Sequence, residues 1–385
     1  MSGKRRDKRG RILKTGETQR SDGSYMYRYT DIHKKRKYVY ARTLEKLRQK
    51  EADIHRDLID GIDTTGGEMT VIELVDKYMN LKRDIRENTR RGYGTPIKRI
   101  RNDPFGQRRI KDIRKSDAKT WFVKLHDGGL KQNTISVYQS ILRPAFEMAV
   151  EDDLIRKNPF KFTLSDFIPD DQEKRTALTE EQVIKYLAFM KENASGTYFE
   201  EIQVLLETGL RVSELYGLTI RDIDFSSNCI HVRRQLCRTA EQAYFITDTK
   251  TKSGVRDIPM TPKVRQILRS VIQSRPRNTI EMIIDGFSGF LFLDQYGKPK
   301  VAMHLENYMR NKREQLVKRY GCQFPIVSPH ILRHTFCTNM QRAGLDVKSL
   351  QYLMGHSTAS VTLDVYTHTD YHAVEKAFQK VTACG

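Results

Sequence analysis

The stretch PHILRHTF, residues 329–336, decides how the C-terminal half of this chain folds and works. A proline followed by apolar residues at helical spacing predicts a helix that begins near Pro329. His330 and Arg333 are three residues apart and therefore share one face of that helix. The local sequence is compatible with three interpretations: a metal site, a solvated helix face, or the phosphate-binding part of an active site.

A metal site is the weakest of these interpretations. His330 and His334 have a spacing that zinc sites use, but position 331 is Ile, where the metalloprotease motif H-E-x-x-H has glutamate. No third ligand follows at a plausible spacing, and the charge of Arg333 would repel a dication. The acidic residues of this region form no pattern typical of two-metal chemistry. We therefore expect neither a metal nor another cofactor.

The composition favours a nucleic acid as the partner. The chain has 385 residues, which predicts two or three domains, and 38% are hydrophobic, enough for packed cores. The formal net charge is +20, and Lys and Arg that replace phosphate counterions gain binding free energy. The sequence has no apolar run of about 18 residues, so it predicts no membrane span. The five cysteines include no C-x-x-C pair, so a reduced cytoplasmic setting fits best.

The N-terminal residues 1–65 are predicted to form a small DNA-binding domain. Residues 1–42 contain 14 Lys or Arg against 4 Asp or Glu, half of the total net charge. Basic and aromatic residues alternate in 24–30 and 36–41, which favours strands, whereas 15–24 is typical of a turn. Helical spacing follows over 43–61. We expect three strands and a helix, with a basic strand face in a DNA groove. The alternative is a solvated face with a loose basic tail.

Two further domains follow a Gly- and Thr-rich linker at 63–69. Residues 70–160 carry successive helical patterns and predict an all-α domain with one basic face. Ser116 is a good N-cap for the helix expected at 116–125. Residues 174–385 mix helices with short strands, among them GFLFLD at 289–294, and predict a mixed α/β catalytic domain. The expected fold class is thus α+β and multidomain.

Six polar residues of the last domain together specify a site for a phosphodiester. They are Arg211, Lys252, His330, Arg333, His356 and Tyr366. Two guanidinium groups can bind both non-bridging oxygens of a phosphate and stay charged. A tyrosine supplies a nucleophile, a lysine can protonate the departing 5′ oxygen, and a histidine can accept the tyrosine proton. Taken singly, each residue has a structural explanation, so the constellation carries the argument.

The motifs around these residues resemble those of the tyrosine recombinases, the phage integrase family. They are TGLRVSEL, TKTKSGVRDIP, HILRHTF, LMGHS and LDVYTH, in the family's order. The resemblance extends to the whole chain, as an arm-binding unit, a helical core-binding domain and a catalytic domain. It is strongest to integrases of conjugative transposons. It implies integration and excision of a mobile element through a 3′-phosphotyrosine intermediate, without metal or ATP, in a bacterial cytoplasm at the nucleoid.

The resemblance also implies a role for each residue. Arg211 and Arg333 would clamp the scissile phosphate, and His330 would assist them and handle the tyrosine proton. His356 would hydrogen-bond the phosphate, and Tyr366 would be the nucleophile. Lys252 would be the general acid, although Lys250 shares its strand face and stays an alternative. Glu214 would orient the site, and Tyr371 is a second candidate nucleophile.

The family implies a homotetramer on core and arm sites of double-stranded DNA, with accessory excision and DNA-bending proteins as possible partners. In the tail 371–385, Val374, Ala377, Phe378 and Val381 form a helical stripe. We expect this tail to pack into a neighbouring protomer, with packing in cis as the alternative. A type IB topoisomerase-like enzyme and a catalytically silent DNA-binding regulator are the alternative functions.

Overall fold

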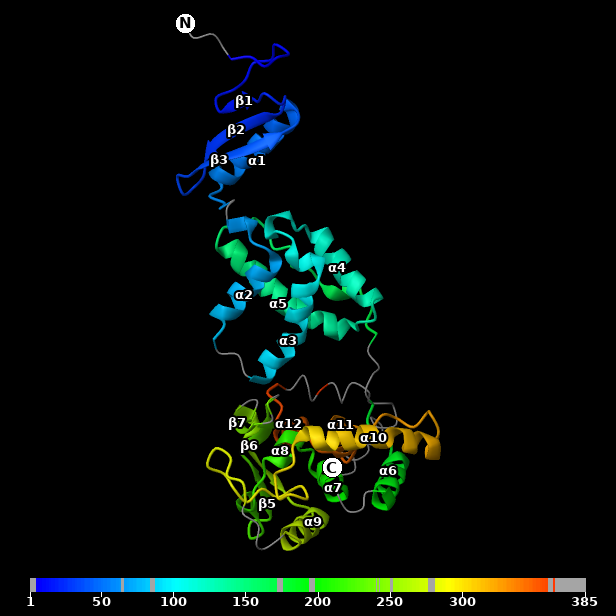
Figure 1. Ribbon diagram of the computed structural model, residues 1–385. Helices are drawn as coiled ribbons and strands as arrows, with labels where there is room; N and C mark the ends of the chain where they lie inside the picture. Colours follow the sequence, from blue (N-terminus) through cyan, green and yellow to red (C-terminus); the bar gives the residue numbers. More distant parts are fainter. Residues whose placement is uncertain are drawn as a thin grey trace, which may run out of the picture. The chain divides into compact units, whose positions relative to one another are not determined.

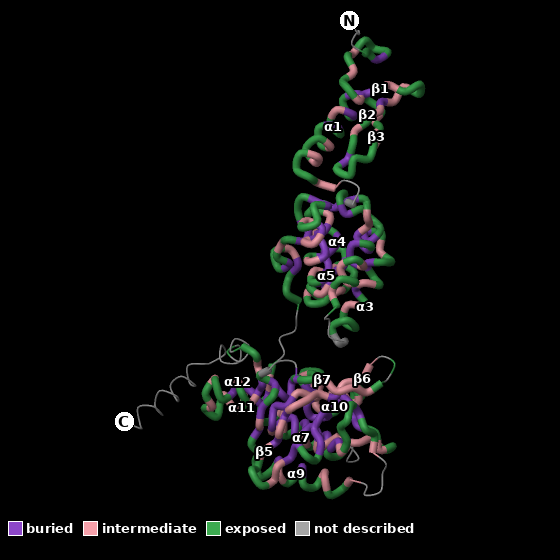
Figure 2. Tube along the Cα trace, turned by 90° about the vertical axis from the view of Figure 1, so that its left-hand side faces the viewer, coloured by how far each residue is buried: buried purple, intermediate pink, exposed green. Residues whose placement is uncertain are grey.

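The chain divides into two compact units, Met1–Glu173 and Lys174–Gly385 (Figure 1). The computed structural model describes residues 5–63, 66–83, 87–171, 176–193, 198–239, 241, 243–249, 252–275, 281–358 and 363. Buried residues gather inside each unit, along α4 (Lys115–Asp127) and α5 (Gln132–Glu151) in the first and α7 (Phe199–Thr208) in the second (Figure 2). Among the described residues, no helix is both long and apolar enough to cross a bilayer.

The first unit begins with an antiparallel three-stranded sheet and a helix, as predicted. The elements are β1 (Glu17–Gln19), β2 (Tyr25–Thr30), β3 (Arg36–Ala41) and α1 (Leu44–Ile59). Tyr25 and Tyr27 pack with Leu44 and Leu47 of α1 in a small core. The third strand, β1, lies inside 15–24, which the sequence predicted as a turn. It forms there because its backbone pairs with β2.

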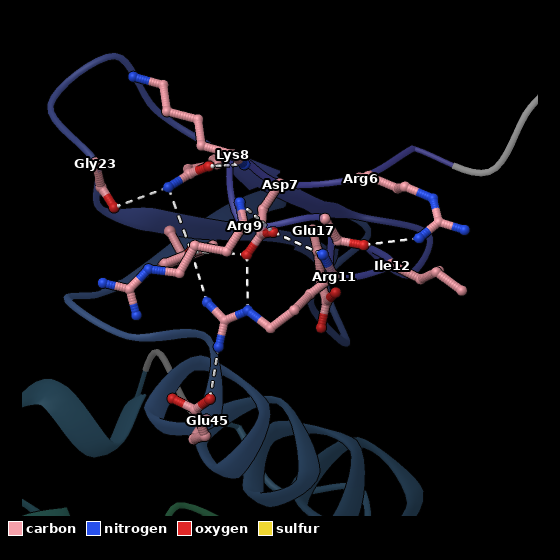
Figure 3. Close-up of polar contacts among 12 residues, drawn as sticks. Arg6, Asp7, Lys8, Arg9, Arg11, Ile12, Glu17, Gly23 and Glu45 are labelled. Atoms are coloured by element: carbon pink, nitrogen blue, oxygen red, sulfur yellow. Dashed lines mark hydrogen bonds and ion pairs between the residues drawn. The ribbon is translucent and has the colours of Figure 1, made fainter.

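The basic segment before the sheet is held in place by Asp7 (Figure 3). The buried carboxylate of Asp7 accepts hydrogen bonds from the backbone N–H of Arg11 at 2.8 Å, from its Nε at 2.8 Å and from the Tyr25 hydroxyl at 2.9 Å. Arg11 also reaches Glu45, in the first turn of α1, at 2.7 Å. The alternative of a loose basic tail is therefore wrong for residues 5–13.

A helical part completes the first unit. Its main helices are α2 (Val71–Leu81), α3 (Glu87–Asn102), α4 and α5. Thr70 and Glu73 form a capping box at the start of α2. The predicted N-cap at Ser116 was wrong: the N-cap of α4 is Arg114, two residues earlier, because Asp117 accepts the backbone N–H of Arg114 at 2.9 Å.

The sheet and the helical part have separate apolar cores within one compact unit. Polar contacts join them: Arg156 beyond α5 bonds Asp57 of α1 at 2.8 Å and also pairs with Asp60. The backbone N–H of Asp63 donates to the backbone carbonyl of Asp153 at 2.9 Å.

The second unit has the expected mixed α/β composition. Its helices are α6 (Glu180–Asn193), α7, α8 (Val212–Tyr216), α9 (Pro262–Gln273), α10 (Ala302–Tyr320), α11 (Pro329–Arg342) and α12 (Val347–Met354). Its strands are β4 (Ile223–Asp224), β5 (Cys229–Val232), β6 (Arg234–Arg238), β7 (Tyr244–Asp248) and β8 (Arg256–Pro259).

The strands form a sheet in the order β4-β5-β8 and a separate β6-β7 hairpin. The strand predicted at 289–294 is not formed; the segment makes only isolated bridges, such as Phe290 to Thr219. The residues after Thr219 fold as a 3₁₀ turn, Ile220–Asp222, and not as a strand. They therefore offer no extended edge with which 289–294 could pair.

Candidate active site

Three arginines from separate segments converge on the C-terminal end of α12. The last carbonyls of a helix have no partner within it and carry partial negative charge, so cations are stabilised there. Three consecutive carbonyl oxygens accept one arginine each. The bonds run from Arg256 Nε to Leu353 at 2.7 Å, from Arg333 Nη2 to Met354, and from Arg211 Nη2 to Gly355 at 2.9 Å.

The turn after α7 brings Arg211 and Arg333 together. Gly209 ends α7 with φ +64, and its carbonyl accepts Arg333 Nη1 at 2.6 Å. A Cβ on Gly209 would lie 2.3 Å from the ring of Phe336 on α11. Only glycine permits both this left-handed backbone and this close approach of α7 to α11. Arg211 then stands at the N-cap of α8.

Glu214 links two of the three arginines. Its carboxylate, fully buried, accepts Arg211 Nη1 at 2.6 Å, the Arg211 backbone N–H at 3.0 Å and Arg256 Nη2 at 2.9 Å. Burial alone raises the pKa of Glu214, but the charges of Arg256, Arg211 and Arg333 outweigh it and lower the pKa. Glu214 is therefore a carboxylate that fixes the positions of its neighbours.

The cluster keeps an excess of positive charge in the part of the chain that the structure describes. Burial, followed by repulsion from Arg211, lowers the pKa of Arg333 to about 9. Arg333 still carries its proton near neutral pH, at a cost in free energy. A phosphate bound between the two guanidinium groups would relieve that cost.

The two predicted histidines flank this cluster. His330 is exposed in the first turn of α11, where the Ser328 side chain caps the helix. His356 directly follows Gly355, and its backbone N–H donates to Gln351 at 3.2 Å. Burial, then the charges of Arg333, Arg211, Arg256 and His330, lower the pKa of His356 to about 4. At neutral pH His356 is thus an uncharged imidazole that can still hydrogen-bond an anion.

His334 has a different environment from the other two histidines. It is half-buried, and its Nδ1 lies 3.2 Å from the hydroxyl of Thr338, one turn later on α11. Over the residues that the structure describes, no group of three or more His, Cys, Asp or Glu could hold a metal ion.

The structure leaves two of the predicted residues partly or wholly undescribed. The backbone at Lys252 begins a 3₁₀ turn, Lys252–Gly254, between β7 and β8, as the sequence predicted. Lys250, Tyr366 and the tail 371–385 lie outside the described residues. Arg211, Glu214, Arg333 and His356 are brought together, and His330 lies one turn from Arg333 on α11.

Sequence reasoning missed Arg256. Its side chain is fully buried on β8, where it shares the inner face with Ile258; Val255, just before the strand, is exposed, and Asp257 is half-buried. A charged residue at an inward position of a strand requires a charged partner, because an unpaired buried cation is very costly. The alternation in VRDIP was therefore a usable signal.

Comparison with known proteins identifies the family. Residues 176–373 match the model described as the phage integrase family. Residues 1–58 match the DNA-binding domain of Tn916 integrase. The chain belongs to the phage integrase family.

Several relatives resemble nearly the whole chain. The transposase from transposon Tn916 of Enterococcus faecalis is 41% identical over 96% of this chain and 95% of its own length. The transposase from Tn1545 of Streptococcus pneumoniae has the same identity and coverage. A solved structure of the Tn1549 transposon integrase with transposon right end DNA matches at TM-score 0.76 and 37% identity. It covers 82% of this chain and 100% of that one.

A lambda integrase dimer bound to a core site matches in fold alone, at TM-score 0.58 and 17% identity, over 96% of this chain and 98% of that one. The chain is accordingly a tyrosine site-specific recombinase of a mobile element, as predicted. The comparisons favour this function over the topoisomerase and the silent regulator.

The lowered pKa of His356 predicts a pH effect on stability. The unfolded chain protonates this histidine below its ordinary pKa of about 6.5, whereas the folded protein does so only near pH 4. Stability that depends on neutral His356 is therefore present above about pH 6.5 and is lost as the pH falls towards 4. We expect urea unfolding to show that the wild type loses more stability than His356→Gln between about pH 7 and pH 5. An equal loss in both proteins would contradict the shifted pKa.

Proposed function

We propose that Arg211 and Arg333 clamp the scissile phosphate of a DNA strand. The observation that carries this proposal is their anchoring to adjacent carbonyls, Gly355 and Met354, immediately before His356. A guanidinium has five N–H donors. Among the described residues, each of these arginines makes two bonds from its terminal nitrogens to the protein, and further N–H donors could bind phosphate oxygens. Arg211 is one-quarter exposed, and Arg333 lies deeper.

The proposed reaction is a transesterification in which Tyr366 attacks the scissile phosphorus. The tyrosine oxygen forms a bond to phosphorus as the bond from phosphorus to the 5′ oxygen breaks. His330 accepts the tyrosine proton, and Lys252 or Lys250 protonates the departing 5′ oxygen. Attack by a second 5′-OH reverses these steps and rejoins the strand. Neutral His356 hydrogen-bonds a phosphate oxygen, and Glu214 holds Arg211 in place.

This chemistry is tested by trapping the covalent intermediate. A suicide DNA site, nicked so that the 5′-OH fragment diffuses away, is incubated with the protein and examined on an SDS gel. We expect a DNA–protein adduct that Tyr366→Phe abolishes and Tyr371→Phe retains. An adduct that survives Tyr366→Phe but disappears in Tyr371→Phe would move the nucleophile to Tyr371.

We further propose that residues 1–65 bind arm-type DNA sites, 70–160 bind the core site and 174–385 cleave it. The strand register places Arg28 beside Tyr38, and Met26 beside Tyr40, on the face of the sheet opposite α1. Tyr38 and Tyr40 are about half exposed, and the guanidinium of Arg20 lies 5.2 Å from the ring centre of Tyr40. An exposed basic and aromatic strand face suits a DNA groove.

Replacing this face should separate the two DNA-binding activities. We expect Tyr38→Ala with Tyr40→Ala to weaken arm-site binding on the order of tenfold or more, because each lost contact costs about 1–3 kcal/mol. Deletion of 1–65 should abolish arm binding and leave core cleavage intact. Lys37→Ala is the matched control, since its side chain faces the opposite side of the same strand. Equal loss of arm binding and core cleavage would refute the division.

For the assembly, we propose a tetramer on two duplexes in which the tail 371–385 of each protomer docks on a neighbour. An apolar cavity of about 340 Å³ between α6, α10 and the start of α11 is a suitable acceptor. It is lined by Tyr186, Phe189, Met309, Leu316 and Val327, among others. The apolar stripe of the tail matches this chemistry. Strand exchange replaces one phosphodiester by another of similar energy, so accessory DNA-bending or excision proteins would set its direction. We place the reaction at the bacterial nucleoid.

The tail proposal predicts a defect in strand exchange. We expect Phe378→Asp to reduce complete recombination at least tenfold and to change DNA binding by less than about threefold, because a charge would be buried without a partner. Gln379→Asp adds the same charge beside the apolar stripe and should recombine normally. Normal recombination by Phe378→Asp, or by a protein lacking 371–385, would rule out tail docking.

A further inference from the structure

Arg256 is the most deeply buried cation among the described residues of the second unit and belongs to none of the roles above. Its side chain is fully buried and makes bonds to three segments. Nη2 donates to Glu214 on α8 at 2.9 Å, Nη1 to the carbonyl of Gly254 at 2.9 Å, and Nε to the carbonyl of Leu353 on α12 at 2.7 Å.

We propose that Arg256 is a positioning residue for strand cleavage: it holds Glu214, and through Glu214 the guanidinium of Arg211, in register with the end of α12. This inference rests on the proposed role of Arg211 as part of the phosphate clamp.

The geometry of the carboxylate supports the first half of this proposal. Oε1 of Glu214 accepts a hydrogen bond from the side chain of Arg211. Oε2 accepts one from Arg256 and one from the backbone N–H of Arg211. Arg256 therefore neutralises Oε2, the carboxylate oxygen that the Arg211 guanidinium does not use. Without Arg256, Glu214 would keep a full charge and draw further donors of Arg211 away from the phosphate.

The bonds to backbone carbonyls support the second half. Gly254 closes the 3₁₀ turn that Lys252 begins, and Leu353 lies one residue before the carbonyl that holds Arg333. A Cβ on Gly355 would come within 3.0 Å of Arg256 Nη1, so the end of α12 is packed directly on this guanidinium. Arg256 thus ties the turn that carries Lys252 to the segment that carries His356.

Packing alone does not explain why position 256 is an arginine. The neighbouring inward position on β8 is Ile258, and apolar residues often replace buried ion pairs at no cost in stability. Arg256→Met removes one partner of such a pair and will lower stability, but Glu214 stays paired with Arg211, so the variant should still fold while losing the three bonds.

The test compares Arg256→Met and Arg256→Lys with the wild-type full-length protein. Single-turnover cleavage of a suicide site, DNA affinity and thermal unfolding are measured for each. We expect Arg256→Met to cleave on the order of 100-fold more slowly, because a small misplacement of reacting groups has an effect of that size. Its DNA affinity should stay within about threefold of wild type. Arg256→Lys keeps the charge but loses the planar fork, and should be intermediate. Arg275→Met is the matched control, because Arg275 is a half-buried arginine that pairs with Glu281 outside the site.

Two readouts separate positioning from packing. In a Glu214→Gln background, where the unbalanced charge is absent, Arg256→Met should cost less than tenfold, against roughly 100-fold alone. The pKa of His356, followed by NMR, should rise in Arg256→Met, because Arg256 is one of the charges that lower it.

Equal losses in both backgrounds, an unshifted His356, or parallel falls in stability, affinity and cleavage would overturn the inference. So would wild-type cleavage by Arg256→Met. Failure of the wild type to form any adduct would instead overturn the proposed function.

Discussion

The candidate active site depends on one constraint: three successive carbonyls at the C-terminus of α12 must each accept a different arginine. These carbonyls have no partners within the helix, and water or a cation must satisfy them. Because arginines satisfy these carbonyls, three segments that are distant in the sequence are held against the end of α12. Gly209 and Gly355, both with positive φ, provide the tight turns that let these segments meet.

The same constraint explains the electrostatics. Clustered guanidinium groups repel one another, and this repulsion with burial lowers the pKa of Arg333. One carboxylate, Glu214, and the helix terminus offset only part of the charge among the described residues. In the proposed mechanism, the remaining charge is already oriented before DNA binds, so little reorganisation accompanies the increase of negative charge on the phosphate.

The sequence predicted the fold class, and it named Arg211, Glu214 and Arg333, which the structure brings together. It did not predict the contacts that hold these residues in place. Periodicity revealed the helix of His330 and Arg333, because both residues lie on one element. It did not reveal β1, which exists through pairing with β2, or the start of α4, which Asp117 determines. The carbonyl acceptors were also beyond reach, since backbone groups leave no residue signature.

In the proposed mechanism, the negative charge of the scissile phosphate is the partner of the arginine pair. The most direct measurement replaces that phosphate with a neutral methylphosphonate and compares covalent adduct formation by the wild type and Arg211→Ala. On ordinary DNA the variant should lose on the order of 10²–10³-fold in rate, as for other fixed electrostatic donors. On methylphosphonate DNA, where there is less charge to neutralise, the loss should shrink to less than about tenfold. The same loss on both substrates would contradict an electrostatic clamp.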